Sequence, residues 1–174
     1  MIFRDWLDSL RRRRAAAPSR RKQHQSIHQA EVLEARRMLT TGTISLSATS
    51  GKLTIQGTAN DDTSSVTMLN GTTVRATIQT GAGSLTQDFA AADVTSILFR
   101  GEAGDDTFTN STAFDVRAFG DDGDDFLTGG SGDDELFGRS DNDTIVGGDG
   151  DDLLRGDDSN SGTQGNDSVD GGAG

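Results

Sequence analysis

Apolar residues recur every nine positions between residues 120 and 155. Written in registers of nine, this stretch reads GDDGDDFLT, GGSGDDELF, GRSDNDTIV and GGDGDDLLR. Each register begins with glycine, carries aspartate at its sixth position and has an apolar residue at its eighth. The apolar residues are Leu127, Leu136, Ile145 and Leu154. Four consecutive registers that share three positions form an internal repeat.

One register predicts a tight turn followed by a short strand. Glycines at positions one, two and four permit the positive φ angles of such a turn. The three residues after the aspartate alternate outward, inward and outward, as in a strand. Repetition of this unit predicts a parallel coil with two registers per circuit. The position-six aspartates then stack in rows, 18 residues apart along the chain.

The pattern G-G-x-G-x-D-x-U-x resembles the RTX, or haemolysin-type, calcium-binding nonapeptide repeat. The resemblance covers residues 101–174 and is closest where the registers are intact. It implies an all-β fold, a parallel β-roll. It also implies several Ca²⁺ ions, held between neighbouring turns by position-six aspartates and turn carbonyls, in a bacterial protein that is secreted or on the cell surface.

The predicted metal ligands are oxygen atoms, since Ca²⁺ takes roughly six to eight of them from carboxylates and carbonyls. The position-six aspartates are Asp106, Asp125, Asp134, Asp143, Asp152 and Asp167. The predicted set also includes position one (Gly120, Gly129, Gly138, Gly147), position three (Asp122, Ser131, Ser140, Asp149) and position five (Asp124, Asp133, Asn142, Asp151). We expect position five, with Asp105 and Asn166, to contribute backbone carbonyls. Zn²⁺ is disfavoured because residues 40–174 contain no Cys or His.

The spacing also predicts which aspartates stack on each other. The expected pairs are Asp125 with Asp143, Asp134 with Asp152, and Asp143 with Asp167. Asp106 lies 19 residues before Asp125 and is expected at the irregular edge of the row. The change Asp143→Ala should therefore be more harmful than Asp106→Ala.

Two stretches depart from the repeat. Residues 110–119 lose the glycines and gain one residue, so we expect the coil to continue through Phe114, Val116 and Phe119 without a full metal turn. Residues 159–164 are inserted before the last register, which resumes at Gly165 and adds Val169 to the inward ladder. The chain then stops on half a repeat without the polar cap of a solenoid. This predicts a C-terminally truncated repeat region.

Residues 40–100 predict a lead-in region of short β-strands that covers the first coil. Apolar residues alternate with polar or small ones at Ile44/Leu46, Leu53/Ile55, Val66/Met68, Val74/Ala76/Ile78 and Ile97/Phe99. Asn70-Gly71 between two such runs predicts a hairpin, and a further turn is expected at 81–83. The stretch 57–63 is open to two interpretations, a degenerate repeat turn or a solvated acidic turn.

Charge divides the chain at residue 39. Residues 1–39 contain ten Lys/Arg and four Asp/Glu, whereas residues 40–174 contain six and 24. The carboxylates of residues 40–174 would repel one another without counterions, and we expect divalent cations to neutralise them. Residues 1–39 form a basic leader, expected to be disordered or helical. Nucleic acid is not an expected partner, because the body that the leader serves is strongly anionic.

The leader does not have the form of an ordinary signal peptide, because Pro18 interrupts its short apolar stretch. Residues 33–39, LEARRML, partly resemble the L-E-P-R-x-L-L motif found ahead of large secreted repeat proteins. Ala35 stands for the proline and Met38 for the first of the paired leucines. This resemblance implies a sorting segment.

The sequence predicts a calcium-binding module outside the cell and not an enzyme. Residues 40–174 lack the His or Cys that serine, cysteine and zinc hydrolases need. No apolar run is long enough for a transmembrane helix. Folding coupled to Ca²⁺ is expected, and further domains of a longer secreted protein or a cell-surface matrix are candidate partners. The alternative is a fragment of a larger RTX-bearing hydrolase, epimerase or toxin without its catalytic domain.

Overall fold

A computed structural model describes residues 41–157 and 165–174 of the chain. The predictions for the leader 1–39, including its motif at 33–39, lie outside the described residues, as does the insertion 159–164. The described residues all belong to one compact unit. Within the described residues it consists of two β-sheets and a single short 3₁₀ helix, η1 (Ala91–Asp93). No described helix has the length and apolar character required to cross a membrane.

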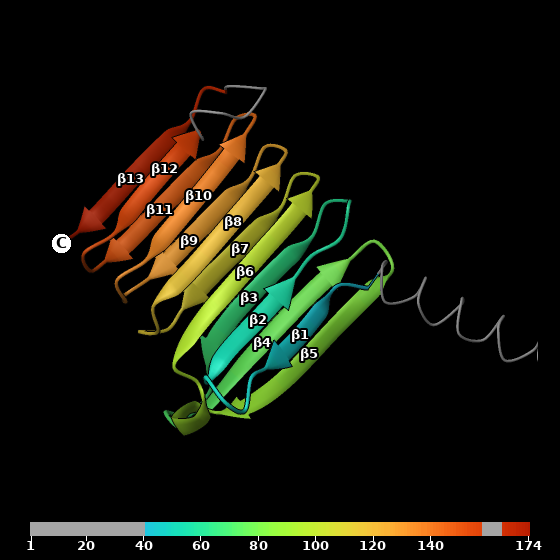
Figure 1. Ribbon diagram of the computed structural model, residues 1–174, viewed down its shortest axis with the longest axis vertical. Coiled ribbons are helices and arrows are strands. Elements are labelled where there is room, and N and C mark those ends of the chain that lie inside the picture. The colour runs from blue at the N-terminus through green and yellow to red at the C-terminus, as the bar shows by residue number, and fades with distance from the viewer. Residues whose placement is uncertain (1–40, 158–164) are drawn as a thin grey trace, which may run out of the picture. The chain divides into compact units, whose positions relative to one another are not determined.

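The two sheets face each other across the core (Figure 1). The six-stranded sheet, sheet A, has the order β1 (Thr43–Leu46), β2 (Lys52–Gln56), β6 (Ser96–Ala103), β8 (Val116–Asp122), β10 (Glu135–Ser140) and β12 (Leu153–Asp157). The seven-stranded sheet, sheet B, has the order β13 (Ser168–Ala173), β11 (Thr144–Asp149), β9 (Phe126–Gly130), β7 (Thr107–Ser111), β3 (Thr63–Met68), β4 (Thr73–Thr80) and β5 (Gly83–Ala90).

The chain crosses from one sheet to the other with each register, as the repeat predicts. Strands β6, β8, β10 and β12 pair in parallel in sheet A, and β7, β9, β11 and β13 pair in parallel in sheet B. Leu127 is the register partner of Ile145, and Leu136 that of Leu154. Partners 18 residues apart confirm the parallel β-roll with two registers per circuit.

The lead-in region contributes a coil of its own to the roll. Strand β2 pairs in parallel with β6, and β3 pairs in parallel with β7. The expectation that this region covers the first coil is therefore too simple. Strands β4 and β5 together with η1 form an insertion between β3 and β6, and residue 100 lies inside β6. The division into regions 40–100 and 101–174 stays a prediction.

The hairpin predicted at Asn70-Gly71 joins β3 and β4, which pair antiparallel. Gly71 has a φ of 77°, and the Asn70 side chain accepts a hydrogen bond from the Thr72 amide. The predicted turn at 81–83 is also present, but the strand after it was missed. This strand, β5, has polar residues at half of its positions and pairs only with β4, and its only large apolar residues, Leu85 and Phe89, are separated by Gln87 on the half-buried face.

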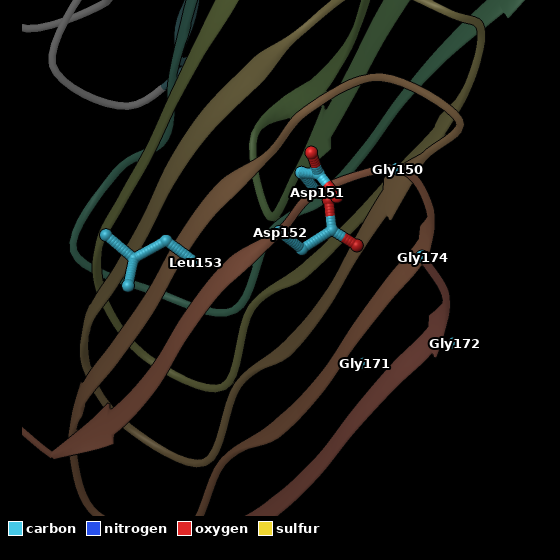
Figure 2. A pocket seen from close by; sticks show the side chains of 7 residues that line it. All are labelled: Gly150, Asp151, Asp152, Leu153, Gly171, Gly172 and Gly174. Carbon is cyan, nitrogen blue, oxygen red and sulfur yellow. The ribbon is translucent and has the colours of Figure 1, made fainter.

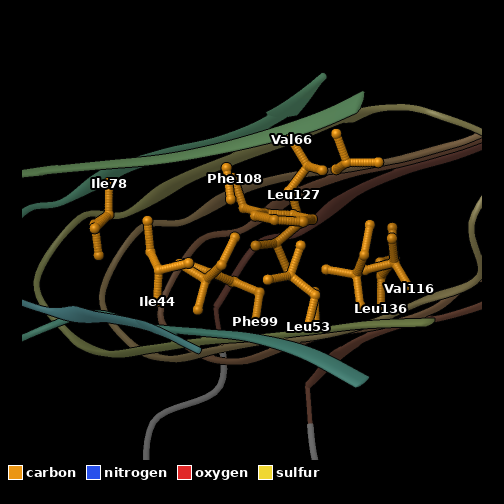
Figure 3. Packing of buried hydrophobic residues seen from close by; sticks show 14 of the residues in the cluster. Ile44, Leu53, Val66, Ile78, Phe99, Phe108, Val116, Leu127 and Leu136 are labelled. Atoms are coloured by element: carbon orange, nitrogen blue, oxygen red, sulfur yellow. The ribbon is translucent and has the colours of Figure 1, made fainter. Parts of the chain in front are cut away.

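The core is a ladder of apolar side chains between the sheets (Figure 3). Leu127, Leu136 and Ile145 are fully buried, as predicted. The rings of Phe99 and Phe108 stack with their centroids 4.6 Å apart. The coil also continues through 110–119, where Val116 is buried. Val169 departs from the prediction because it lies on β13, the edge strand of sheet B, and half of its surface is exposed.

The outer face of sheet A carries a second stack of rings. Phe119 and Phe137 lie 5.2 Å apart, and the Arg117 guanidinium lies over both rings. Five of the six basic residues between 40 and 174 lie on strands of this sheet, at Lys52, Arg100, Arg117, Arg139 and Arg155. The guanidinium groups cover the rings and add cation–π attraction to their stacking.

Truncation of this stack is expected to weaken the roll. Phe137→Ala should lower the free energy of unfolding by about 2–3 kcal/mol, because it removes a stacked ring that is 9% exposed. Phe126→Ala is the matched control, since Phe126 is 42% exposed, and it should cost less than about 1 kcal/mol. Urea unfolding in saturating Ca²⁺ measures both values. Equal losses in the two variants would contradict a stabilising role for the outer stack.

Candidate metal centres in two stacks of turns

The turns that join the sheets form two stacks. The first turn stack joins sheet A to sheet B, and its position-six residues are Asp62, Asp106, Asp125, Asp143 and Asp167. The second turn stack joins sheet B back to sheet A and places Asp134 and Asp152 in the same role. Val116 takes the position-six place in the first turn of this second stack, where its amide faces Asp134.

Hydrogen bonds link the position-six aspartates into ladders. In each step the Oδ1 atom of one aspartate accepts the backbone N–H of the position-six residue one coil earlier. The distances are 2.8 Å from Asp106 to Asp125, 3.0 Å from Asp125 to Asp143, 3.0 Å from Asp143 to Asp167 and 3.0 Å from Asp134 to Asp152. The expected stacking pairs are present, including the pair that spans the insertion.

Asp106 does not lie at the edge of its row, contrary to expectation. Its Oδ1 accepts the Asp62 amide at 2.7 Å, and its own amide donates to Asp125. The coil that contains Asp62 was not identified with certainty from the sequence, so the row seemed to begin at Asp106. Asp106 and Asp143 therefore have equivalent places within the row.

The second carboxylate oxygen of these residues is buried and has no hydrogen-bond partner. This holds for Oδ2 of Asp106, Asp125, Asp134, Asp143 and Asp152. An anionic oxygen removed from water without a partner is costly, so each position requires a cation or a proton. Asp152 also lines an open pocket with Gly150 and Gly171–Gly172 at the edge of the roll (Figure 2).

The Oδ2 atoms of the position-six aspartates lie where a side chain at position one would be, so only glycine leaves room for them. A methyl group at Gly120 would lie 1.9 Å from Oδ2 of Asp125, and one at Gly138 would lie 2.0 Å from Oδ2 of Asp143. Position-one glycines do not have positive φ angles, contrary to expectation. Positive φ occurs at positions two and four, as at Gly123 (127°), and even at the non-glycine Arg139 (93°). Glycine at position one is thus required for close approach.

Burial raises the pKa of several position-six carboxyl groups. The pKa rises to about 8 for Asp125 and to about 7 for Asp106, Asp134 and Asp143. Loss of hydration is the largest cause, and neighbouring carboxylates of the same row add to it. The ladder hydrogen bonds oppose the rise but do not cancel it.

Carboxylate and carbonyl oxygens converge at the position-one glycines. A methyl group at Gly129 would meet Oδ2 of Asp134 at 2.1 Å and the carbonyl oxygen of Gly147, from the next coil, at 2.7 Å. The described residues contain no group of three or more His, Cys, Asp or Glu side chains suited to a metal. Backbone carbonyls must therefore complete any coordination shell, and a shell of oxygens alone suits Ca²⁺ better than Zn²⁺.

Position five carries a second ladder, which the sequence reasoning missed. Here the later coil donates to the earlier one: the Asn142 amide donates to Asp124 Oδ1 at 2.8 Å, and the Asp151 amide donates to Asp133 Oδ1 at 3.1 Å. The presence of Asp or Asn at position five of every register could have indicated this ladder. The expected role of the position-five carbonyls stays a prediction.

The position-three residues lie at or near strand ends, where the turns begin. Asp122 and Ser140 are register partners at the ends of β8 and β10. Asp149 ends β11, and the Ser131 amide donates to the Thr112 carbonyl at 3.1 Å. The position-three residues therefore lie where the chain leaves a strand and enters a turn. Their role as metal ligands stays a prediction.

Parallel strands in two sheets, joined by glycine turns that carry rows of buried aspartates, define a parallel β-roll. Residues 119–154 and 155–174 match the family model of the RTX calcium-binding nonapeptide repeat (4 copies). This part of the chain consists of RTX repeats, and calcium binding follows from them. Comparison with curated proteins and with solved structures found no match. The turn at 57–62 and the registers from 101 to 118 lie outside the matched residues.

The raised pKa values predict how pH affects the calcium-free fold. A carboxyl group with a higher pKa in the folded state binds protons more tightly there than in the unfolded chain. Its stabilising contribution is full below its ordinary pKa of 3.8 and is lost as pH rises through about 7–8. Calcium-free protein should therefore melt at a higher temperature at pH 5 than at pH 8, and Asp125→Asn should reduce this difference. A higher melting temperature at pH 8 would contradict the assignment.

Proposed function

We propose that this chain is a non-enzymatic, extracellular module whose RTX repeats bind several Ca²⁺ ions between coils and fold when they do so. The observation that carries the proposal is the row of buried Oδ2 atoms without partners. The position-six aspartates Asp106, Asp125, Asp134, Asp143, Asp152 and Asp167 would hold the ions. Carbonyls of positions one, three and five in the same turns would complete the coordination.

Electrostatics supports the coupling of folding to calcium. Each unit of pKa difference between the folded and unfolded states corresponds to about 1.4 kcal/mol. Four carboxyl groups with folded-state pKa values near 7 or 8, against an ordinary value of 3.8, would each cost on the order of several kcal/mol if they were ionised in the fold, and together they would at least match the net stability of a typical domain. Cations bound only by the folded state offset this cost.

Calorimetric titration of the full chain with Ca²⁺ tests the assignment of the sites. Asp125→Asn keeps the size of the side chain but removes the charge, and it should reduce the number of bound ions or weaken their affinity at least 10-fold. Asp93→Asn is the matched control, because Asp93 is exposed on η1, and it should bind like the unaltered protein. Unchanged binding in Asp125→Asn would exclude Asp125 as a ligand.

An extracellular location fits the calcium concentrations that such modules need. Extracellular calcium modules typically bind with dissociation constants of roughly 10⁻⁴–10⁻³ M, far above the free calcium of the cytosol. The basic leader 1–39 would then act as a sorting segment through its motif at 33–39. Deletion of 1–39 should leave calcium affinity unchanged and keep the protein inside the cell, and normal export of the deletion variant would contradict this role.

A further inference from the structure

The turn between β2 and β3, residues 57–62, reproduces the geometry of the repeat turns with only part of their sequence. It reads GTANDD, which keeps the glycine of position one and the aspartate of position six but has no glycine at positions two and four. Its Asp62 lies 44 residues before Asp106, because β4, β5 and η1 intervene. The coil is nevertheless in register with the roll, since Leu53 pairs with Ile97 and Ser64 with Phe108.

Two oxygen atoms at this turn occupy the same relative places as at the next turn of the stack, which begins at Gly101. A methyl group at Gly57 would meet Oδ2 of Asp62 at 2.8 Å and the carbonyl oxygen of Gly101 at 2.4 Å. At Gly101 the corresponding neighbours are Oδ2 of Asp106 at 2.2 Å and the carbonyl oxygen of Gly120 at 2.4 Å. The own-turn carboxylate and the next-coil carbonyl thus converge at 57–62 as they do within the roll.

Two buried carboxylate oxygens beside this turn have no hydrogen-bond partner. Asp62 is 2% exposed and Asp106 is 1% exposed. Oδ1 of Asp62 and Oδ2 of Asp106 are unpartnered, although Oδ2 of Asp62 accepts the Thr58 amide at 2.5 Å. A solvated acidic turn would expose these carboxylates to water. The two residues lie in adjacent coils, linked by the hydrogen bond from the Asp62 amide to Asp106 Oδ1, and burial of their unpartnered oxygens requires a cation or a proton.

We infer that Asp62, Asp106 and the Gly101 carbonyl hold a further Ca²⁺ ion, outside the residues matched by the family model. This inference rests on the proposed calcium binding of the repeats. It extends the first turn stack into the coil formed by β2 and β3. Calcium then ties the lead-in region to the repeats.

Calcium counting on the full chain tests this site. Native mass spectrometry should find one Ca²⁺ fewer in Asp62→Asn than in the unaltered protein, and no change in Asp93→Asn. Circular dichroism in saturating Ca²⁺ shows whether each variant keeps its β-structure. An equal count in folded Asp62→Asn would overturn the inference, whereas an unaltered protein that binds no calcium would overturn the proposed function itself.

A crystal structure of the calcium-loaded full chain is the second measurement, and it does not depend on any variant. Anomalous difference density between Asp62 and Asp106 would establish the ion. Ions between Asp125 and Asp143 but none between Asp62 and Asp106 would overturn this site and leave the proposed function standing.

A different observation singles out the turn at 110–116 in the second turn stack. Asn110 stands at position one and Val116 at position six, where the repeats have glycine and aspartate. Asn110 is 2% exposed. Its side-chain amide donates to the Gly129 carbonyl of the next coil at 2.6 Å and lies 3.4 Å from the carbonyls of Thr112 and Phe114.

The oxygen atom of the Asn110 side-chain amide also has hydrogen-bond partners. Oδ1 of Asn110 accepts the backbone N–H and the hydroxyl of Thr112 at 3.1 and 2.7 Å. Carbonyl oxygens that surround a donor with partial positive charge resemble the oxygen shell of a cation. The loss of the position-six carboxylate at Val116 keeps the charge balanced, because a neutral amide needs no counterion.

We propose that the Asn110 amide stands in the place of a calcium ion, so that this turn closes without metal. The connection between β7 and β8 then closes without an ion of its own, and calcium sites of the second turn stack begin at Asp134. The roll thus contains one coil junction that holds no calcium ion.

Asn110→Asp tests this role, because it keeps Oδ1 and exchanges only the NH₂ donor for an anionic oxygen. Asn70→Asp is a matched control: Asn70 is exposed, and its Oδ1 also accepts the N–H and hydroxyl of a threonine two residues later, Thr72. In saturating Ca²⁺, Asn110→Asp should bind one additional ion, while Asn70→Asp should bind the same number as the unaltered protein. Without calcium, the melting temperature of Asn110→Asp should fall more steeply between pH 5 and pH 7 than that of Asn70→Asp, because a buried carboxylate without a cation is costly once it ionises. An unchanged ion count together with unchanged stability in Asn110→Asp would overturn the proposal.

Discussion

Removal of calcium at about pH 8 is expected to unfold the roll. The β-sheet circular dichroism of the full chain should be lost in chelator and restored by millimolar Ca²⁺, because the ionised position-six rows cannot be buried without cations. Mg²⁺ should restore it poorly, since Mg²⁺ demands near-octahedral geometry and gives up its water reluctantly. Urea unfolding at a series of Ca²⁺ concentrations measures the coupling, because bound ligand raises stability with its concentration.

Variants of the first turn stack refine this test. Asp106→Ala and Asp143→Ala should both shift the calcium midpoint upward by a similar factor, because each carboxylate accepts the amide of one neighbour and each backbone amide donates to the other. This revises the order expected from the sequence, in which Asp143 seemed more important. A roll that stays folded in chelator at pH 8, with no response to Ca²⁺, would contradict the coupling.

The roll itself could be predicted because its information is local and repeated. Position eight is buried wherever both neighbouring coils are present, as at Leu127 and Ile145, so the nine-residue period fixed strands, turns and register together. The β2–β3 coil could not be placed with the same certainty, because its partners lie 44 residues away across the β4–β5 insertion. Strand β5 was missed because an edge strand with polar residues on both faces has no distinctive pattern.

The sequence was sufficient to predict which residue types form the candidate site. It was less informative about which of their atoms are hydrogen-bonded. The spacing placed Asp125 over Asp143, and the structure links them by a hydrogen bond. The spacing could not show that the backbone amides occupy one carboxylate oxygen and leave the other unpartnered. It also gave no indication that Asn110 substitutes for the glycine of position one with a hydrogen-bonded amide. Such contacts join different coils, so they depend on the three-dimensional stacking and on no single register.

Gly120→Ala is expected to be among the most harmful single changes in the roll. The added methyl group would lie 1.9 Å from Oδ2 and 2.6 Å from Cγ of Asp125, so the carboxylate must leave its place. Its displacement breaks the link to Asp106 and removes an oxygen from the predicted calcium site. We expect a loss of roughly 2–4 kcal/mol in the free energy of unfolding and at least a 10-fold weaker calcium affinity.

Gly81→Ala is the matched control for this prediction. Gly81 lies in the turn between β4 and β5, has nothing within 4 Å of an added methyl group and does not have a positive φ. The same substitution there should change stability by less than about 0.5 kcal/mol and leave calcium binding intact. Urea unfolding and calorimetric titration of both variants in the full chain give the comparison. If Gly120→Ala matched Gly81→Ala in both measurements, close approach of the carboxylate to position one could not be the reason for glycine there.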